Sequence, residues 1–306
     1  MSLDRLVAAG GARVLEHAPV GALTTYRVGG SARALVTLSS AADADELLPL
    51  VDSTGLATIV IGNGSNLLIA DGEHAVVAIR LVGDFANLTW TDEGETVSVV
   101  AGGGLGLPVM ARRLVAEGIV GFEWAVGVPG TVGGAVAMNA GGHGSDMDAS
   151  VRTVELWHQG ARTTWDHDAL VFGYRRSAVA ARDVVLAATV SLERGERSAA
   201  QTRLSEIVRW RREHQPGGAN AGSVFRNPEG DHAGRLIEAA GCKGLRVGSA
   251  VVSEKHANFI IADADGSATD VRRLIELVRA RVAEQSGVVL VTENRFVGFE
   301  DGDGPA

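Results

Sequence analysis

The sequence predicts an α+β fold rich in short α/β units, and three observations support this prediction. Apolar runs of strand length alternate with turn residues and amphipathic helical patterns through most of the chain. Clusters of glycine follow several of these runs. After a charged segment, ERGER, near residue 195, the patterns become longer and more helical. The chain of 306 residues exceeds the usual size of one domain, and we place the domains at residues 1–90, 91–195 and 196–306.

The first domain is expected to be a small α/β unit. Short runs of apolar and β-branched residues predict strands at 33–38, 58–62 and 75–81. A capped helix is predicted at 40–51, between the first two strands.

The second domain is predicted to be rich in strands and the third in helices. A strand at 96–101 precedes a helix from Pro108 to about Glu117, because proline is well suited to the first turn of a helix. The clearest remaining strands of the second domain lie at 151–157 and 184–192. In the third domain, helices are expected at 198–214, 233–240 and 269–286, and strands at 257–262 and 288–297.

Composition and charge exclude several classes of protein. The net charge of −9 argues against a general nucleic-acid or anionic-membrane surface, although a local basic cluster can still bind one anion. Cys242 is the only cysteine, so no intrachain disulfide is possible and a reducing compartment is expected. The N-terminus contains Asp4 and Glu16 and only a short apolar stretch, unlike a secretory signal. We therefore predict a cytoplasmic protein, and nothing in the sequence indicates an obligate protein partner.

The longest uncharged run, residues 124–145, is not expected to insert into a membrane. It is long enough for a span, but Pro129, Asn139, His143 and clustered glycines would leave backbone groups unpaired in lipid. Seven glycines fall within GVPGTVGGAVAMNAGGHG at 127–144. Because glycine loses much conformational entropy on folding, such a stretch predicts that something approaches the main chain closely.

Several common chemical motifs are absent from the sequence. It has no G-x-x-x-x-G-K-[ST] phosphate loop, and the Gly-x-Gly pairs that begin at Gly62 and Gly102 lack the third glycine of a dinucleotide fingerprint. It also has no G-x-S-x-G elbow, H-E-x-x-H helix or Cys/His cluster. The Asp-His-Asp run at 166–168 is interpreted as an exposed turn, so we predict no metal site.

Three glycine-rich loops follow strands and predict a cofactor. In IGNGSNLLI at 61–69, the closely spaced backbone N–H groups of residues 62–66 suit an anion such as a diphosphate, with a tight turn between strands as the alternative. The other two loops are AGGGLG at 101–106 and the stretch at 127–144. A long, flat cofactor with a diphosphate accounts for all three, because backbone donors bind its phosphates and glycines let a ring system lie against the chain.

The run GFEWAVGVPGTVGGAVAMNAGGHG at 121–144 closely resembles the characteristic sequence of the UDP-N-acetylenolpyruvoylglucosamine reductases, the MurB family of flavoenzymes. The resemblance continues in family order through TTYRVGG, IGNGSNLL, FGYRRS, AGSVFRNP and VSEKHANFII, and it covers nearly the whole chain. The compact form of residues 233–259 resembles the shorter subclass, which lacks an extra substrate-capping loop.

The resemblance implies an FAD-binding fold of the vanillyl-alcohol-oxidase (PCMH) type in the first two domains and an α+β substrate-binding domain at the C-terminus. It also implies FAD as the cofactor, and we expect noncovalent binding because IGNGSNLL contains no histidine or cysteine for attachment. The residues expected to bind or line FAD are Val28, Gly29, Gly30, Gly62, Asn63, Gly64, Ser65, Asn66, Gly127, Pro129, Gly130, Thr131, Gly133, Gly134 and Asn139.

The family reaction is a two-step hydride transfer. NADPH reduces FAD, and the reduced flavin gives hydride to the enolpyruvyl double bond of UDP-N-acetylglucosamine-enolpyruvate, which yields the peptidoglycan precursor UDP-N-acetylmuramate. Because hydride addition builds negative charge on the conjugated carboxylate, the site needs fixed electrophiles and a proton donor. By resemblance, Arg175 contacts the carboxylate, Glu293 stabilises the enol intermediate, and Ser223 protonates the second carbon.

Each of these three residues also has a purely structural interpretation. Arg175 taken alone is typical of a solvated surface charge, and Ser223 of a turn residue after Gly222. Glu293 and Arg295 are expected on one face of the last strand, where they would form an ordinary ion pair. Their joint occurrence in the family order favours catalysis.

A basic set within the acidic chain is expected to bind the substrate. Arg211, Arg212 and Arg226, with Asn227, are candidates for the UDP diphosphate, because arginine forms paired hydrogen bonds with phosphate. Lys255 and His256 are further pocket candidates. For the pair Arg211 and Arg212, a solvated helix end next to Glu213 remains the alternative.

The chain departs from the family pattern at two positions. LVTE replaces the more usual LEPE before the final strand, so Val291 stands in place of an acid while Glu293 remains. NAGGHG replaces NAGAYG, so His143 stands in place of a phenol. Two other functions stay open: a flavin oxidase or dehydrogenase of the same fold acting on a small alcohol, and a noncatalytic protein that binds a UDP-sugar.

Overall fold

The computed structural model describes residues 3–299, which form two compact units built from separate stretches of chain. Unit 1 comprises the residues up to 16 together with 34–63 and 75–211, and unit 2 comprises 17–33, 64–74 and the residues from 212 onward. Residues 1–2 and 300–306, at the ends of the first and third predicted domains, lie outside the described residues. This division by packing does not test the predicted domains 1–90, 91–195 and 196–306, because their bounds are those expected of a family fold. The three domains stay a prediction.

The first sheet of the chain has four strands in the order β1-β2-β5-β3. Side chains of helices α1 and α2 share a hydrophobic core with it. Ser40 and Asp43 form a capping box at the start of α2. The side chain of each residue accepts the backbone N–H of the other. The elements are α1 (Leu3–Gly10), β1 (Val14–Ala18), β2 (Ser31–Leu38), α2 (Ala41–Ser53), β3 (Ala57–Val60) and β5 (Glu73–Leu81).

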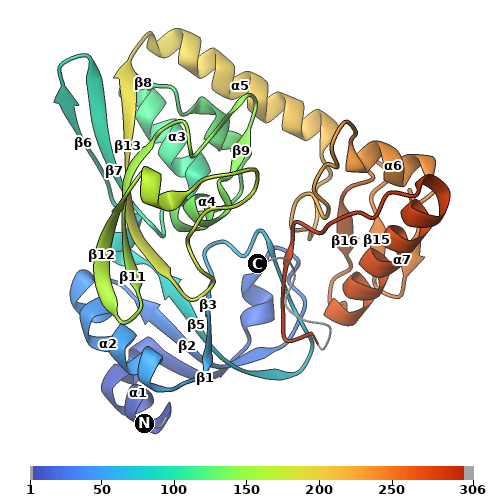
Figure 1. Cartoon of the computed structure of the whole chain (residues 1–306), viewed down its shortest axis with the longest axis horizontal. Coiled ribbons are helices and arrows are strands. Elements are labelled where there is room, and N and C mark those ends of the chain that lie inside the picture. The colour runs from blue at the N-terminus through green and yellow to red at the C-terminus, as the bar shows by residue number, and fades with distance from the viewer. Residues whose placement is uncertain (1–2, 300–306) are drawn as a thin grey trace. The chain divides into compact units, whose positions relative to one another are not determined.

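The second sheet, in unit 1, is antiparallel and has the order β12-β11-β13-β7-β6, with β8 also paired to β13. Helices α3 and α4 pack on one face of it and share its core (Figure 1). The elements are β6 (Leu88–Glu93), β7 (Thr96–Gly102), α3 (Leu107–Ala116), β8 (Ile119–Val120), α4 (Val132–Met138), β9 (Gly141–Gly142), β10 (Ser145–Asp146), β11 (Val151–His158), β12 (Ala161–Asp166), β13 (Val184–Arg194) and α5 (Arg197–His214).

Unit 2 contains a small antiparallel sheet, β14-β15-β16, that packs with α6 and α7, and a separate parallel pair of β4 with β17. The buried ring of Tyr26 belongs to the same core, so the short stretch at 17–33 is part of this unit. The elements are β4 (Leu67–Ile69), α6 (Ala233–Ala239), β14 (Arg246–Val247), β15 (Ala250–Val252), β16 (Ile260–Ala262), α7 (Ala268–Ser286) and β17 (Arg295–Val297).

All five predicted helices are confirmed, with ends within about two residues of those expected. The predicted strand at 288–297 is wrong for its first seven residues, since only Arg295–Val297 is a strand. Val289 and Val291 are 68% and 52% exposed, so the apolar run there does not mark a buried strand. The predicted strand at 257–262 is likewise a strand only from Ile260.

Among the helices of residues 3–299, none combines the length and the apolar character that crossing a bilayer requires.

Candidate active site

Two of the predicted glycine loops meet in unit 1. A Cβ atom on Gly62 would lie 2.3 Å from Oγ1 of Thr131, so only glycine allows the loop after β3 to approach the start of α4 this closely. The side-chain amide of Asn63 donates to the carbonyl oxygen of Pro129 at 2.7 Å. The loops that the sequence assigns to FAD are therefore adjacent.

These loops offer backbone donors that the protein itself does not use. Within the described part of unit 1, the backbone N–H groups of Gly62, Asn63, Gly130 and Thr131 have no protein acceptor. In unit 2, the N–H groups of residues 64–66 have none either. Closely spaced backbone N–H groups bind anions, so each set fits a negatively charged group such as the diphosphate expected of FAD.

The glycines of the loop at 101–106 are explained by the packing of the backbone. A Cβ on Gly102 would lie 2.2 Å from the carbonyl oxygen of Phe85, and a Cβ on Gly103 would lie 2.0 Å from that of Val185. Close packing between backbones therefore requires these glycines, and no cofactor is needed to explain them.

Gly29 and Gly30, predicted to pass near the cofactor, also pack against backbone, in unit 2. A Cβ on Gly29 would lie 2.1 Å from the carbonyl oxygen of Ile69, and one on Gly30 would lie 1.7 Å from that of Gly72. This contact accounts for both glycines, so their contact with FAD, like that of the buried Val28, stays a prediction.

Arg175 is held in a tight turn of unit 1. Gly173 and Arg176 exchange two backbone hydrogen bonds, and Arg175 between them is left-handed, with φ of 57°. Nη2 of Arg175 donates to the carbonyl oxygen of Gly141 at 3.1 Å. The side-chain amide of Asn139, predicted to bind FAD, donates to the carbonyl oxygen of Gly173 at 3.1 Å. Asn139 therefore supports the turn that presents Arg175.

Ser223 and Glu293 lie on neighbouring segments of unit 2. The backbone N–H of Glu293 donates to the carbonyl oxygen of Val224 at 2.7 Å, and an isolated antiparallel bridge continues this pairing by one residue on each segment. Ser223 is half-buried, and Gly222 before it has φ of +74°, which favours glycine. The structure thus brings two of the three predicted catalytic residues together, while Arg175 belongs to unit 1.

The side chain of Asn66 contacts the segment of Glu293. Its amide Nδ2 donates to the carbonyl oxygen of Glu293 at 3.1 Å, within unit 2. Only the backbone N–H of Asn66 remains among the donors open to a diphosphate. Asn66 therefore links the predicted cofactor loop to the segment of the predicted catalytic acid.

Three residues predicted to bind substrate differ in how far their side chains are engaged. Oδ1 of Asn227 accepts the N–H of Ala233 at 3.0 Å, at the start of α6. Nζ of Lys255 donates to the carbonyl oxygen of Arg212 at 2.5 Å. Nε of Arg226 is buried and has no hydrogen-bond partner in the described part of the chain. Arg226 is the one of these three whose buried donor is open to a ligand.

His256, a fourth predicted substrate residue, is half-buried in unit 2. Its Nδ1 accepts the N–H of Asn258 at 3.2 Å, and its ring meets the ring of Phe259 edge-on. Burial lowers the pKa of His256, and the positive charge of Lys243 acts in the same direction. The imidazole is therefore neutral at pH 7, with its proton on Nε2.

Arg211, the fifth, contacts the glycine loop of unit 1. A Cβ on Gly127 would lie 3.4 Å from both Cδ of Arg211 and Cδ2 of His143, so these side chains line the loop. The rings of His143 and Trp210 meet at right angles, with centroids 5.2 Å apart. Burial, and then the charge of Arg211, lowers the pKa of His143, and burial lowers the pKa of Arg211 itself.

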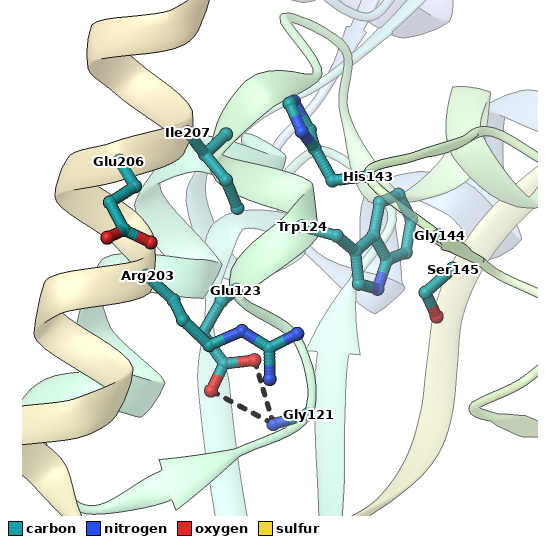
Figure 2. A pocket seen from close by; sticks show the side chains of 9 residues that line it. All are labelled: Gly121, Glu123, Trp124, His143, Gly144, Ser145, Arg203, Glu206 and Ile207. Carbon is teal, nitrogen blue, oxygen red and sulfur yellow. Dashed lines mark hydrogen bonds between the residues drawn. The ribbon is translucent and has the colours of Figure 1, made fainter.

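A pocket of about 310 Å³ adjoins this loop in unit 1. Figure 2 shows α5 on one side of it and the segment around Trp124 and His143 on the other. The buried carboxylate of Glu123 accepts the N–H of Gly121 through both oxygens, at 3.0 and 3.2 Å. Glu123 and Trp124 fall inside the run that resembles the family, but no pattern in the sequence gave either a role. The lining residues are Gly121, Glu123, Trp124, His143, Gly144, Ser145, Arg203, Glu206 and Ile207.

Two protein families match separate parts of the chain. Residues 32–163 match the family described as FAD binding domain. Residues 214–297 match the family described as UDP-N-acetylenolpyruvoylglucosamine reductase, C-terminal domain. These matches confirm the predicted fold class, an FAD-binding fold followed by a C-terminal α+β domain.

Relatives that span the whole chain carry the same description. The UDP-N-acetylenolpyruvoylglucosamine reductase of Synechococcus sp. (strain WH7803) is 42% identical over 298 residues, which cover 94% of each chain. That of Paramagnetospirillum magneticum is 42% identical over 291 residues, which cover 94% of this chain and 92% of the relative. The crystal structure of the reductase from Thermus caldophilus is 34% identical with a TM-score of 0.78, and the match covers 93% of this chain and 98% of that one.

Proposed function

Because the chain belongs to the UDP-N-acetylenolpyruvoylglucosamine reductase family, we propose that it reduces UDP-N-acetylglucosamine-enolpyruvate to UDP-N-acetylmuramate, with NADPH as the hydride donor. The FAD-binding domain makes it a flavin-dependent oxidoreductase. The observation that carries the proposal is the hydrogen bond from the N–H of Glu293 to the carbonyl oxygen of Val224, which keeps Glu293 beside the Ser223 segment. An acid and a hydroxyl on adjacent segments are what protonation of an enol requires.

The reaction needs a cation at the substrate carboxylate. When bound, FAD supplies the hydride carrier between NADPH and one carbon of the substrate double bond. Negative charge then develops on the conjugated carboxylate, and a fixed guanidinium stabilises it. We assign this role to Arg175, because its turn and its hydrogen bond to Gly141 fix the guanidinium.

Ser223 completes the reduction. Its hydroxyl gives a proton to the second carbon of the double bond, and it regains a proton from water, so one hydride and one proton saturate the bond. A serine hydroxyl is a weak acid, so the negative charge that builds on the substrate drives this transfer. Glu293 stabilises the enol form on the way.

We assign the UDP diphosphate to a set of polar and basic residues. Arg226 has the strongest support, because its buried Nε has no partner within residues 3–299 and a phosphate oxygen would supply one. The single cysteine, Cys242, is in keeping with a reaction in the cytoplasm. The other residues of the set are Arg211, Asn227, Lys255 and His256.

The proposal is tested by separating the two half-reactions in Ser223→Ala. Reduction of the flavin by NADPH precedes substrate protonation, so the variant should be reduced at the wild-type rate. Reoxidation by the enolpyruvyl UDP-sugar should slow by at least about 100-fold, the lower range for loss of a general acid. Stopped-flow absorbance of the flavin measures both steps.

Ser205→Ala, at an exposed serine of α5, is the matched control and should leave both steps unchanged. Equal slowing of both steps in Ser223→Ala would show that the serine is structural. NADPH oxidation that does not depend on the enolpyruvyl UDP-sugar would refute the proposed reaction itself.

A further inference from the structure

A buried amide connects three segments of unit 2 that bear predicted functional residues. Asn294 is 0% exposed, and its Nδ2 donates to Oδ1 of Asn66 at 3.0 Å and to the carbonyl oxygen of Ala221 at 3.1 Å. Asn66 ends the predicted diphosphate loop, and Ala221 lies two residues before Ser223. Asn294 itself directly follows Glu293. One side chain therefore connects the predicted diphosphate loop, the segment of Ser223 and the segment of Glu293.

The same amide pair fixes the backbone around Glu293. Nδ2 of Asn66 donates to the carbonyl oxygen of Glu293 at 3.1 Å, and the N–H of Glu293 donates to the carbonyl oxygen of Val224 at 2.7 Å. The N–H of Arg295 donates to the carbonyl oxygen of Asn66 at 2.9 Å. Both peptide groups that flank the Cα of Glu293 are held, and their orientation sets the direction in which its side chain leaves the backbone.

Packing alone does not explain an asparagine at this position. Oδ1 of Asn294 is buried and has no hydrogen-bond partner within the described residues. A buried acceptor without a partner destabilises a fold, so packing considered without hydrogen bonds would favour an apolar side chain of similar size. The two hydrogen bonds donated by Nδ2 are therefore what explains an asparagine at position 294.

We propose that Asn294 is a positioning residue of the reaction, which acts through Asn66 to orient Glu293 relative to Ser223. The inference rests on the proposed function, because it takes Glu293 and Ser223 to act on the enolpyruvyl substrate. In this proposal the side chain of Asn66 holds the segment of Glu293 in place, while the backbone N–H of Asn66 stays open to the cofactor.

Asn294→Val tests the proposal, because valine is similar in size and removes both donors. Reduction of the flavin by NADPH should stay within about twofold of the wild type, since it does not use Glu293. Reoxidation by the enolpyruvyl substrate should slow about 10- to 100-fold, as expected when a catalytic group is displaced by roughly 1 Å. KM for the substrate should change less than kcat, because the UDP-binding residues are untouched.

Val278→Ala is the matched control. Val278 is 1% exposed in the core of the same unit, on α7, so its truncation destabilises unit 2 without touching the amide pair. It should lower the melting temperature and leave both half-reactions unchanged. Asn294→Ser, which keeps one donor, should slow reoxidation by an intermediate factor and serves as the second variant if valine prevents folding.

A measurement on the flavin-free protein tests the same contacts without catalysis. In Asn294→Val, amide hydrogen exchange should accelerate in residues 221–225 and 290–297 relative to Val278→Ala, because the bond from Glu293 to Val224 opens more often.

Three results would overturn the inference: reoxidation slowed no more in Asn294→Val than in Val278→Ala, equal slowing of both half-reactions, or unchanged exchange in those two segments. Failure of the proposed function is separate, because wild-type enzyme would then not be reoxidised by the enolpyruvyl substrate at all.

Discussion

Arg175 keeps a backbone conformation that glycine would adopt more easily. Its φ of 57° lies in the left-handed region, which costs an ordinary residue about 1–2 kcal/mol. A turn with no other role would favour glycine or asparagine at this position. Strain of this kind concentrates at functional sites, so the retained guanidinium supports the proposed contact with the substrate carboxylate.

Arg175→Gly should therefore stabilise the turn and impair the reaction. The free energy of unfolding should stay the same or rise by up to about 1 kcal/mol, as measured by urea denaturation. Reoxidation by substrate should slow by at least about 10-fold, because a charged hydrogen bond to the carboxylate contributes about 1.5–3 kcal/mol.

The neighbouring Arg176→Ala provides the comparison, since Arg176 is exposed in the same turn. It should leave reoxidation unchanged. A similar loss of rate in both variants would indicate a general disturbance of the turn and remove Arg175 from the mechanism.

The two adjacent loops of unit 1 form one element, to which we assign part of the proposed cofactor site. Gly62 and Thr131 bring them into contact, and Asn63 fastens one to the other through Pro129. The contribution that we expect from them is a set of backbone N–H groups without a protein acceptor in the described residues. No side chain of IGNGSNLL has a nucleophile suited to flavin attachment.

Noncovalent FAD is therefore expected. Acid precipitation of the purified protein should release all of the flavin into the supernatant. The absorbance spectrum of the supernatant is measured and compared with that of free FAD. Yellow colour retained in the washed pellet would contradict this expectation and indicate a covalent bond.

The loop after β4 also caps α7, within unit 2. The carboxylate of Asp71 accepts the hydroxyl of Ser267 at 2.8 Å and the backbone N–H groups of Ala268 and Thr269 at 3.1 and 3.0 Å. It thereby satisfies two of the four open N–H groups of the helix start. Burial alone would raise the pKa of Asp71, but these hydrogen bonds outweigh burial and lower it.

Asp71→Ala should lower the free energy of unfolding of unit 2 by about 0.5–2 kcal/mol, the usual range for a lost helix cap. Because the folded-state pKa is lowered, the stabilisation is present above the unfolded-state pKa and is lost as the pH falls through the folded-state value. Denaturant melts of the variant at pH 7 and in acid measure both effects. Glu284→Ala, exposed on the same helix, should change little.

At the scale of the whole molecule, two histidines contribute to the way stability responds to acid. Burial lowers the pKa of His256 in unit 2 and of His143 in unit 1. Unfolded histidine titrates near pH 6.5, so below that value the unfolded chain binds more protons than the folded one. The contribution of these two histidines to the free energy of unfolding should therefore fall as the pH drops below about 6.5, until their folded-state pKa values are passed.

His256→Asn should reduce this loss of stability in acid, because an amide oxygen can accept the N–H of Asn258 without titrating. Thermal melts between about pH 7 and 5 measure the slope of stability against pH. A slope unchanged by His256→Asn would contradict the assignment.

His167→Asn is the opposite case. The hydrogen bond to Asp148 raises the pKa of His167, so the stabilisation by His167 is present at low pH and lost as the pH rises.

Local patterns predict the helices well, because the apolar stripe of a helix such as α7 lies within one continuous segment. The apolar run at 288–291 misled the strand prediction, since strand pairing depends on a partner that the run itself does not specify. Asn66 and Asn294 are 228 residues apart, so no local pattern could reveal their hydrogen bond. The resemblance supplied Ser223 and Glu293 as candidates, and only the fold gives Asn139 and Asn66 their supporting contacts.

The parallel pairing of β17 with β4 constrains the order in which the chain acquires its structure during synthesis. Leu67 pairs with Arg295 and Ile69 with Val297, so β4 leaves the ribosome long before its partner. At 5–20 residues per second the delay is roughly 10–45 seconds, during which the nascent chain must keep an unpaired edge from binding elsewhere. The contacts of Glu293 with Asn66 form across the same gap. The segment of Glu293 is therefore translated 227 residues after Asn66, and a chain terminated between them contains the proposed diphosphate loop without the proposed acid.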